Sequence, residues 1–365
     1  MQVCFLGLRA FSTLCQSVDF VNILSPAPDA TGQGFFVDTD KPVKFHPHIS
    51  ELFRVDESPG KVYDSNKIII GGMSVLLGAL ETGGTKMVCA LGNEKGEIFE
   101  RESYPTRDPG STFADVISFF QGRGIEALGV SCFGPVDLNE DSPTFGYITN
   151  TPKPGWSHVS VRGRLMEALG VPVGFDTDVN GAALGEAEMG AGKGLGSLVY
   201  YTIGTGLGGG FYYRGTLLHG LVHPEMGHML MRPHPKDPAP HGFCPFHDGC
   251  LEGMACGKAM QQRWGVPAHE LPPDHIAWEI EAEYLAQMCA NTTVILSPER
   301  IVLGGGVMHQ EHLFPMVRKR TLELLNNYVS HPAILEHIDT YIVPPGLGNN
   351  SGAVGSLLLA VRALG

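Results

Sequence analysis

Two segments of this chain share one pattern, in which an apolar strand runs into a glycine turn and then into a second apolar strand. The first is LETGGTKMVC, from Leu80 to Cys89, and the second is YTIGTGLGGGFYY, from Tyr201 to Tyr213. The second holds five glycines within seven residues, far more than a tight hairpin requires. Because strands and helices alternate around both segments, the pattern predicts an α/β fold with two similar halves that face one cleft.

Residues 1–72 differ from the rest of the chain, because they are rich in turn-forming residues and show little periodicity. We interpret them as an N-terminal extension of unknown role, or as an artefact of an over-extended gene model. Strand-like runs begin at Met73. We expect a first lobe over 73–190, completed by a C-terminal helix over 351–365, and a second lobe over 191–350.

Charge and apolar patterning argue against several classes of protein. The formal net charge of -13 disfavours binding to nucleic acids or to anionic membrane surfaces. No apolar run approaches the roughly 20 residues that a membrane-spanning helix needs. The first eight residues contain no Lys or Arg, and no small-residue cleavage pattern follows them, so a secretory signal is not expected. We expect a cytoplasmic protein with neither a nucleic-acid nor a membrane partner.

Three glycine turns have the composition of phosphate-binding loops. They contain Gly83, Gly84 and Thr85; Gly204, Thr205 and Gly206; and Gly304, Gly305 and Gly306. In each, backbone N–H groups could surround an anion, and the third turn is expected to end a strand and open a helix. Neither a P-loop motif nor a dinucleotide-binding fingerprint in the required context is present. A single such turn is often a plain hairpin, but the three together favour a nucleotide site.

Two acids stand between a short strand and a helix of small residues in VPVGFDTDVNGAALGE. A carboxylate at this junction projects into a cleft rather than into the core. Asp178 is therefore the candidate general base, because it lies nearest to the turn and precedes Asn180. The alternative is that both Asp176 and Asp178 only cap the following helix.

A loop rich in histidine and proline contains Cys244, His247 and Cys250, with His228 upstream. Two thiolates and two imidazoles suit tetrahedral Zn²⁺, and four protein ligands would make the metal structural. His223, His234 and His241 are alternative ligands in place of His228, and a surface loop with incidental Cys and His is the simpler interpretation. The remaining cysteines are expected to be buried apolar residues: Cys4, Cys15, Cys89, Cys132, Cys256 and Cys289.

In this order, the motifs of the chain resemble those of ROK-family sugar kinases, and they are most similar to the zinc-containing bacterial fructokinases. The resemblance covers Met73 to Gly365 and rests on ETGGTK, CFGPVD, TNTPKPGW, DTDVNGAALGE, TIGTGLGGG, PEMGH, CPFHDGCLEG and VLGGGV. It implies a two-lobed actin/hexokinase-like (ribonuclease H-like) ATPase fold with an inserted zinc loop. It also implies a homodimer that transfers a phosphoryl group from Mg·ATP to a hexose, with D-fructose favoured.

The resemblance also implies roles for individual residues. ATP would be bound by Gly83, Gly84, Thr85, Lys86, Gly204, Thr205 and Gly206, with Gly304, Gly305 and Gly306 at the adenosine. The sugar would be bound by Gly134, Asn150, Asp178, Glu225, His228 and Glu252, with Asp178 as the base. Structural zinc would be held by His228, Cys244, His247 and Cys250. The chain departs from the family pattern at Glu81, where the family usually has Asp, and at Thr177, where it usually has Asn.

Two other functions fit parts of the same pattern. One is a ROK kinase for glucose, mannose, allose or an N-acetylhexosamine. The other is a ROK-type transcriptional regulator that binds sugar without turnover, but 1–72 show no clear pair of helices for binding DNA.

Overall fold

The computed structural model describes residues 24–25, 36–37 and 75–365. The chain divides into two units, Met1–Met73 and Ser74–Gly365. In the first unit, β1 (Leu24–Ser25) and β2 (Phe36–Val37) pair antiparallel. The remainder of the predicted N-terminal extension, with Cys4 and Cys15, lies outside the described residues.

The first sheet of the second unit has five strands in the order β5-β4-β3-β6-β7. They are β3 (Leu77–Thr82), β4 (Lys86–Gly92), β5 (Ile98–Pro105), β6 (Ala127–Cys132) and β7 (Val173–Thr177). The β3–β4 and β4–β5 pairs are antiparallel, whereas β6 is parallel to both β3 and β7. Strand β3 is buried along nearly its whole length, as expected for a strand covered on both faces.

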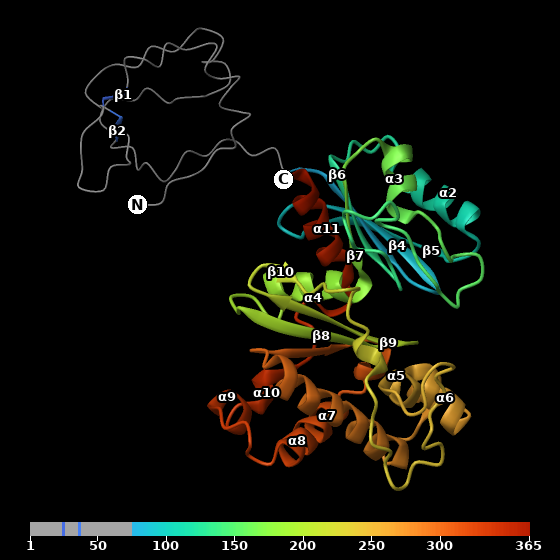
Figure 1. Ribbon diagram of the computed structural model, residues 1–365, viewed down its shortest axis with the longest axis vertical. Helices are drawn as coiled ribbons and strands as arrows, with labels where there is room; N and C mark the ends of the chain where they lie inside the picture. Colours follow the sequence, from blue (N-terminus) through green and yellow to red (C-terminus); the bar gives the residue numbers. More distant parts are fainter. Residues whose placement is uncertain (1–23, 26–35, 38–74) are drawn as a thin grey trace. The chain divides into compact units, whose positions relative to one another are not determined.

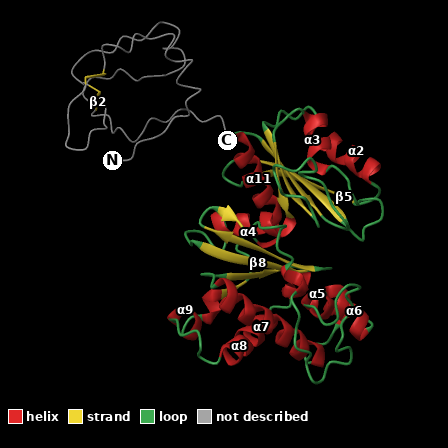
Figure 2. Ribbon diagram, viewed as in Figure 1, coloured by secondary structure: helices red, strands yellow, loops and turns green. Residues whose placement is uncertain are grey.

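The second sheet repeats this arrangement in the order β10-β9-β8-β11-β12. Its strands are β8 (Ser197–Ile203), β9 (Leu207–Tyr213), β10 (Thr216–Leu217), β11 (Ile301–Gly304) and β12 (Ile342–Val343). Here too the hairpin strands are antiparallel, and β11 is parallel to β8 and β12. Each strand has a counterpart in the first sheet (Figure 2), which confirms the prediction of two similar halves.

Helices cover both faces of each sheet (Figure 1). They are α2 (Pro109–Phe120), α3 (Val161–Leu169), α4 (Asp178–Glu188), α5 (Leu251–Ala255), α6 (Gly257–Trp264), α7 (Ile276–Leu296), α8 (Leu313–Leu325), α9 (Pro332–Leu335), α10 (Ile338–Tyr341) and α11 (Ser351–Leu364). Helices α4 and α11 lie between the two sheets, α2 and α3 lie outside the first, and α7 and α8 lie outside the second. The structure is thus the two-lobed α/β fold that the sequence predicts.

Local signals set several helix ends. Helix α2 begins after Asp108, whose carboxylate accepts a hydrogen bond from Ser111 N at 3.0 Å, and Pro109 occupies its first turn. Helix α3 stops at Gly170, which has a left-handed φ of 69°. Of the helices in the described part of the chain, none combines the length and the apolarity that crossing a membrane requires.

Glycines allow α4 and α11 to cross at close range. A Cβ at Gly355 would lie 1.8 Å from Gly181 O, and one at Gly185 would lie 2.5 Å from Ser351 O. The same is true where α11 crosses β6, since a Cβ at Gly129 would lie 1.7 Å from a backbone oxygen of α11. The C-terminal helix therefore packs against the first sheet as well as against α4.

One buried carboxylate joins the two segments that connect the inner helices to the second sheet. Glu186, on α4, accepts hydrogen bonds from Ala191 N at 2.7 Å, in the segment that leads into β8. It also accepts bonds from Gly346 N, Leu347 N and Ser351 Oγ at 2.7–3.0 Å, at the start of α11. With its side chain fully buried, Glu186 needs these donors to offset the loss of hydration.

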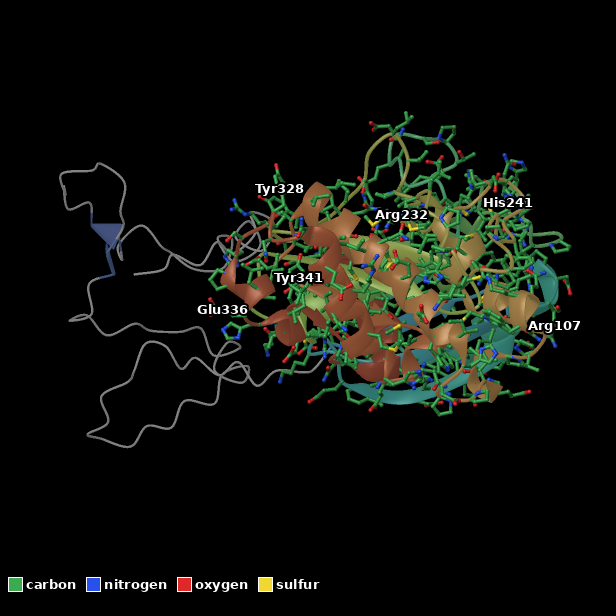
Figure 3. The ribbon with its side chains drawn as sticks, turned by 90° about the horizontal axis from the view of Figure 1, so that it is seen from below. Arg107, Arg232, His241, Tyr328, Glu336 and Tyr341 are labelled. Carbon is green, nitrogen blue, oxygen red and sulfur yellow. The ribbon has the colours of Figure 1, made fainter. Side chains whose placement is uncertain are left out.

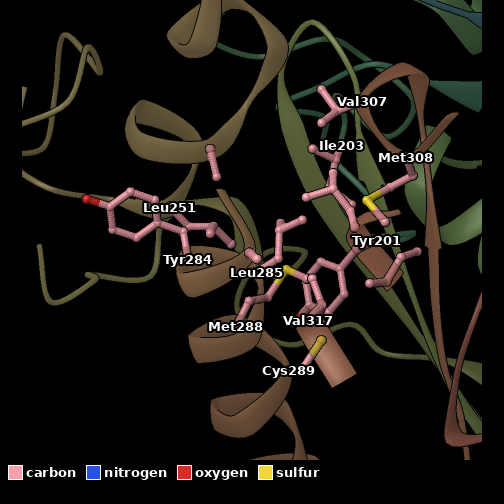
Figure 4. Close-up of a cluster of buried hydrophobic side chains, with 14 of the residues drawn as sticks. Tyr201, Ile203, Leu251, Tyr284, Leu285, Met288, Cys289, Val307, Met308 and Val317 are labelled. Carbon is pink, nitrogen blue, oxygen red and sulfur yellow. The ribbon is translucent and has the colours of Figure 1, made fainter. Parts of the chain in front are cut away.

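The core of the second half anchors β8 against its outer helices (Figure 4). Tyr201 and Ile203 of β8 pack with Leu285 and Met288 of α7 and with Val317 of α8. The Tyr201 hydroxyl also shares a hydrogen bond of 2.7 Å with a threonine hydroxyl of α7. Fully burying each such side chain contributes about 1.5–3 kcal/mol, so the strand end that carries the second glycine turn is held firmly.

Candidate active site

The two hairpins end in three-residue loops, Gly83–Thr85 and Gly204–Gly206. A Cβ added at Gly84 would meet no described atom within 4 Å, and one added at Gly204 would come no closer than 3.8 Å. Neither glycine has a positive φ. Packing and backbone conformation would therefore accept a side chain at both positions. The free space beside these amides is what a phosphate bound by backbone N–H groups requires.

Glu252, on α5, lies against the second loop. Its Oε2 accepts a hydrogen bond of 3.1 Å from Leu207 N, and a Cβ at Gly206 would lie 2.8 Å from that oxygen. Gly206 is therefore explained by the approach of Glu252. On the other side of the loop, Gly204 O accepts a bond of 2.8 Å from Gly257 N at the start of α6.

The third glycine turn ends β11 as predicted, but the helix that it opens is only a 3-10 turn and not the expected long helix. A short 3-10 turn, Gly306–His309, comes next, and α8 begins only at Leu313. Gly304 and Gly305 are explained by packing, because added Cβ atoms would lie 2.4 Å from Tyr200 OH and 2.5 Å from the Ile203 backbone. Gly306 alone borders open space.

A cavity of about 170 Å³ lies where both halves meet. It is lined by Glu81, Asp178, Val179, Ala182, Tyr200, Thr202, Gly305, Gly348, Asn349, Ser351 and Gly352. Glu81 comes from β3, just before the first loop, and Asp178 is the first residue of α4. The structure therefore brings together the predicted base, the acid of the first motif and one glycine of the third turn.

Both carboxyl groups in this cavity hold a proton more tightly than usual. Burial raises the pKa of Asp178 to about 7, against the effect of a 2.9 Å hydrogen bond from Val179 N to Oδ1. The carboxylates of Glu81 and Glu225 act in the same direction as burial. Burial also raises the pKa of Glu81, although nearby basic side chains oppose it. Two carboxyl groups that line one cavity are a suitable donor set for Mg²⁺, which prefers oxygen ligands.

The alternative that Asp176 and Asp178 cap the helix is wrong. Thr177 is the capping residue of α4, because its hydroxyl accepts a hydrogen bond of 3.1 Å from Asn180 N. Asp176 is buried and accepts bonds from Asn180 Nδ2 at 2.8 Å and from His219 Nε2 at 2.9 Å. Asp178, by contrast, lines the cavity.

The segment before the metal loop approaches the first half of the molecule. His223 is buried, and its Nε2 accepts a hydrogen bond of 3.1 Å from Val136 N. Its ring packs beside Gly134, where an added Cβ would lie 3.4 Å away. His223 Nδ1 lies 3.7 Å from an oxygen of Glu225, whose pKa is raised by burial. His223 therefore lies next to both Gly134 and Glu225, the two residues predicted at the sugar site.

Three other predicted ligand-binding residues are exposed. Thr205 is exposed in the loop Gly204–Gly206, and Lys86 is exposed at the start of β4. Asn150 is exposed in the segment that leads to α3. No contact places Asn150 near the cavity, so its role in sugar binding stays a prediction.

Four predicted metal ligands form one cluster. The ligand atoms of His228, Cys244, His247 and Cys250 all lie within 4.8 Å of one another. His228 Nδ1 lies 3.5 Å from Cys250 Sγ and 3.9 Å from Cys244 Sγ, which in turn lies 3.6 Å from His247 Nδ1. Tetrahedral zinc with ordinary bond lengths would set nitrogen and sulfur about 3.6 Å apart. The donor set and its spacing therefore fit zinc.

The alternative histidine ligands lie elsewhere. His223 bonds to the first half of the molecule, His234 Nε2 lies 3.7 Å from Glu279, and His241 bonds to Asp248 at 2.8 Å on the surface (Figure 3). The prediction that the cysteines of the described part outside this cluster are buried is confirmed for Cys89, Cys132, Cys256 and Cys289.

Sequence reasoning missed His219 and His223, which bind Asp176 and Val136 across long stretches of chain. The only sequence signal for them is their nearness to the PEMGH motif; His223 is predicted only as an alternative metal ligand, and His219 is given no role. Lys153 was also missed, although it stands in the TPKPGW motif. Its ammonium contacts the first loop at Gly84 O.

Comparisons with known proteins agree with this geometry. Residues 77–363 match the family described as the ROK family. The fructokinase of Pediococcus pentosaceus is 44% identical over 290 residues, which cover 80% of this chain and 99% of the relative. The fructokinase of Zymomonas mobilis is 44% identical over 296 residues, which cover 79% of this chain and 97% of the relative.

The fold also matches a solved structure of a similar protein. The ROK hexokinase of Thermus thermophilus superposes with a TM-score of 0.64 at 26% identity. The match covers 80% of this chain and 99% of the hexokinase. Both kinds of comparison therefore leave the same fraction of the chain, about a fifth, unmatched.

Proposed function

Because this chain belongs to the ROK family, we propose that it is an ATP-dependent fructokinase, which transfers the γ-phosphoryl group of ATP to O6 of D-fructose. The observation that carries the proposal is the cavity between the halves, which Asp178 lines together with Glu81, on the strand that leads into the first glycine loop, and Thr202, on the strand that leads into the second. Phosphoryl transfer needs alignment and charge stabilisation more than covalent help from the protein.

The two loops bind the phosphate chain in this proposal. Gly84 and Gly204 leave their backbone N–H groups open to a ligand, and the loops come from matching positions in the two sheets. Gly306, at the third turn, borders the adenosine. Mg²⁺, when bound, neutralises charge on the phosphates, and Glu81 is the carboxylate that would hold it. Because the backbone N–H groups of the loops would already point at the phosphates, they would need little reorganisation during the reaction.

Asp178 removes the proton of the sugar hydroxyl. Its Oδ1 already accepts the hydrogen bond from Val179 N, so Oδ2 takes the proton. As the O–H bond breaks, the sugar oxygen bonds to the γ-phosphorus, and the bond from that phosphorus to the bridging oxygen breaks to release ADP. A pKa of about 7 suits a general base at neutral pH, because the group is partly ionised and still basic.

Glu225, His228 and Glu252 orient the sugar ring from the second half, with Gly134 and Asn150 on the opposite side. His228 faces the metal cluster through Nδ1, while its Nε2 lies 4.0 Å from Glu252. Zinc held by His228, Cys244, His247 and Cys250 would use four protein ligands and leave no open position for chemistry. The metal therefore has a structural role, which is to keep His228 and Glu252 in place.

The lobes of this enzyme are 73–190 with 351–365, and 191–350, and they close over the sugar. Closure excludes water from the cavity and suppresses the hydrolysis of ATP. The oligomeric state stays a prediction, with the homodimer expected from the resemblance.

The proposal is tested by supplying MgATP and a panel of hexoses to the purified full chain. We expect the highest kcat/KM with D-fructose, and ³¹P NMR should identify the product as the 6-phosphate. A clear preference for glucose, mannose, allose or an N-acetylhexosamine would replace the substrate but keep the reaction. Sugar binding without any turnover across the panel would refute the kinase.

A further inference from the structure

In the first glycine loop, three consecutive backbone carbonyl groups accept hydrogen bonds from residues outside the loop. Gly83 O accepts a hydrogen bond of 2.6 Å from Thr106 Oγ1, and Thr85 O accepts one of 2.9 Å from Thr106 N. Between them, Gly84 O accepts a bond from Lys153 Nζ. All three donors lie outside the loop.

These bonds decide where the N–H groups of the loop point. In a planar trans peptide, the C=O and the following N–H point in opposite directions. Because the Gly83 and Gly84 carbonyls face Thr106 and Lys153, the N–H groups of Gly84 and Thr85 face the other way. That is the direction a phosphate would need, and open space surrounds Gly84.

The ammonium of Lys153 is committed to backbone carbonyls. It donates to Gly84 O and, at 3.1 Å, to Thr106 O. Among the described residues, no ion pair joins it to a carboxylate. A cation bonded to Gly84 O polarises the Gly84–Thr85 peptide and makes the Thr85 N–H a stronger donor.

Lys153 is held in this place by its own segment. Trp156 is almost fully buried, packs against Phe113 and Phe133, and donates from Nε1 to Arg107 O at 2.8 Å. Its backbone N–H bonds to Lys153 O at 3.2 Å. The backbone of Lys153 is therefore fixed by the buried Trp156, and the lysine side chain extends from this fixed segment to the loop.

We propose that Lys153 is a positioning residue for phosphoryl transfer, which fixes and polarises the first glycine loop so that its N–H groups grip the phosphates of ATP. The proposal rests on the proposed function, since it assigns the loop to the nucleotide. It adds a residue that does not touch the substrate but acts through the peptide between Gly84 and Thr85.

The test compares Lys153→Met with Lys153→Arg, and uses Lys95→Met, an exposed lysine in the β4–β5 turn, as the control. Since a charged hydrogen bond is lost, we expect Lys153→Met to raise KM for ATP about tenfold and to lower kcat, with KM for fructose nearly unchanged. Arginine should restore most of the loss. The control should match the parent enzyme.

Calorimetric titration with MgADP separates this proposal from the kinase assignment, because it needs no turnover. We expect Lys153→Met to bind MgADP about tenfold more weakly at an unchanged melting temperature. Parental affinity and parental KM for ATP in that variant would overturn the proposal, as would an equal rise in KM for both substrates. If the parent phosphorylates no hexose but the variant still loses MgADP affinity, the kinase fails and the positioning role stands.

Discussion

The two halves of the molecule share one strand order but support their glycine loops by different means. In the first half, side chains of Thr106 and Lys153 bond to the loop carbonyls. In the second half, Gly257 N donates to the loop carbonyl of Gly204, and the carboxylate of Glu252 accepts a hydrogen bond from Leu207 N, directly after the loop. The comparison teaches that a duplicated fold can build the same kind of loop from a cation on one side and an anion on the other.

The same comparison holds where the inner helices begin. Strand β7 leads directly into α4, and β12 leads through a longer turn into α11, and both helix starts line the cavity. The first copy places Asp178 there, whereas the second places Asn349 and Ser351. Only the first can accept a proton at neutral pH, so the proposed general base belongs to one copy alone.

The largest effect on activity is expected from replacing Asp178, the carboxylate that only the first copy has at the cavity. Asp178→Asn should lower kcat about 10²-fold or more, because the general base is lost while its shape is kept. Fructose binding should stay within a few-fold of the parent, as measured by calorimetry. Parental turnover in this variant would show that the base lies elsewhere.

A pH profile probes the same carboxyl group without a mutation. Because the pKa of Asp178 is raised to about 7, the base is protonated and inactive below that value. We expect kcat/KM to rise with pH and to level off above about pH 7, with close to a tenfold loss per pH unit on the acid side. A value of kcat/KM that stays constant from roughly pH 5.5 to roughly pH 8 would contradict the assignment.

The metal loop has no counterpart in the first half, so its loss should affect the second half alone. Cys244→Ser should lower the zinc content measured by plasma mass spectrometry, and it should lower the melting temperature by roughly 5 °C or more. His241→Asn is the matched control, because His241 lies in the same loop outside the cluster. Equal zinc in both variants would exclude the proposed ligand set.

The smallest effect concerns the helix cap in the first half. Thr177→Ala should destabilise the protein by about 1 kcal/mol, since it removes the acceptor for Asn180 N. Thr177→Asn, which restores the usual family residue, should keep the cap and the stability. If both substitutions are neutral in denaturant unfolding, the hydroxyl does not act as a cap.

Local patterns predicted much of this molecule. The glycine hairpins and the Cys/His cluster both depend on residues close together in sequence. Asp178 could be placed at the cavity for the same reason, since it directly follows a strand.

What could not be predicted depends on distant contacts. Thr177 rather than Asp176 caps α4, because Asp176 is committed to His219, far along the chain. The link from Lys153 to Gly84 joins residues 69 positions apart, and nothing in either motif signals it. The close packing of Gly304 and Gly305 against β8 is another such contact, although Gly305 still lines the cavity.

The buried carboxylate of Glu186 has a mechanical consequence. The chain runs from the inner helices to the second sheet twice, and both passages are tied to this one side chain. If one half swings against the other, we expect the motion to turn about this point, because neither passage can slide without breaking its bond to Glu186. The point lies at the far end of the helix that begins with Asp178.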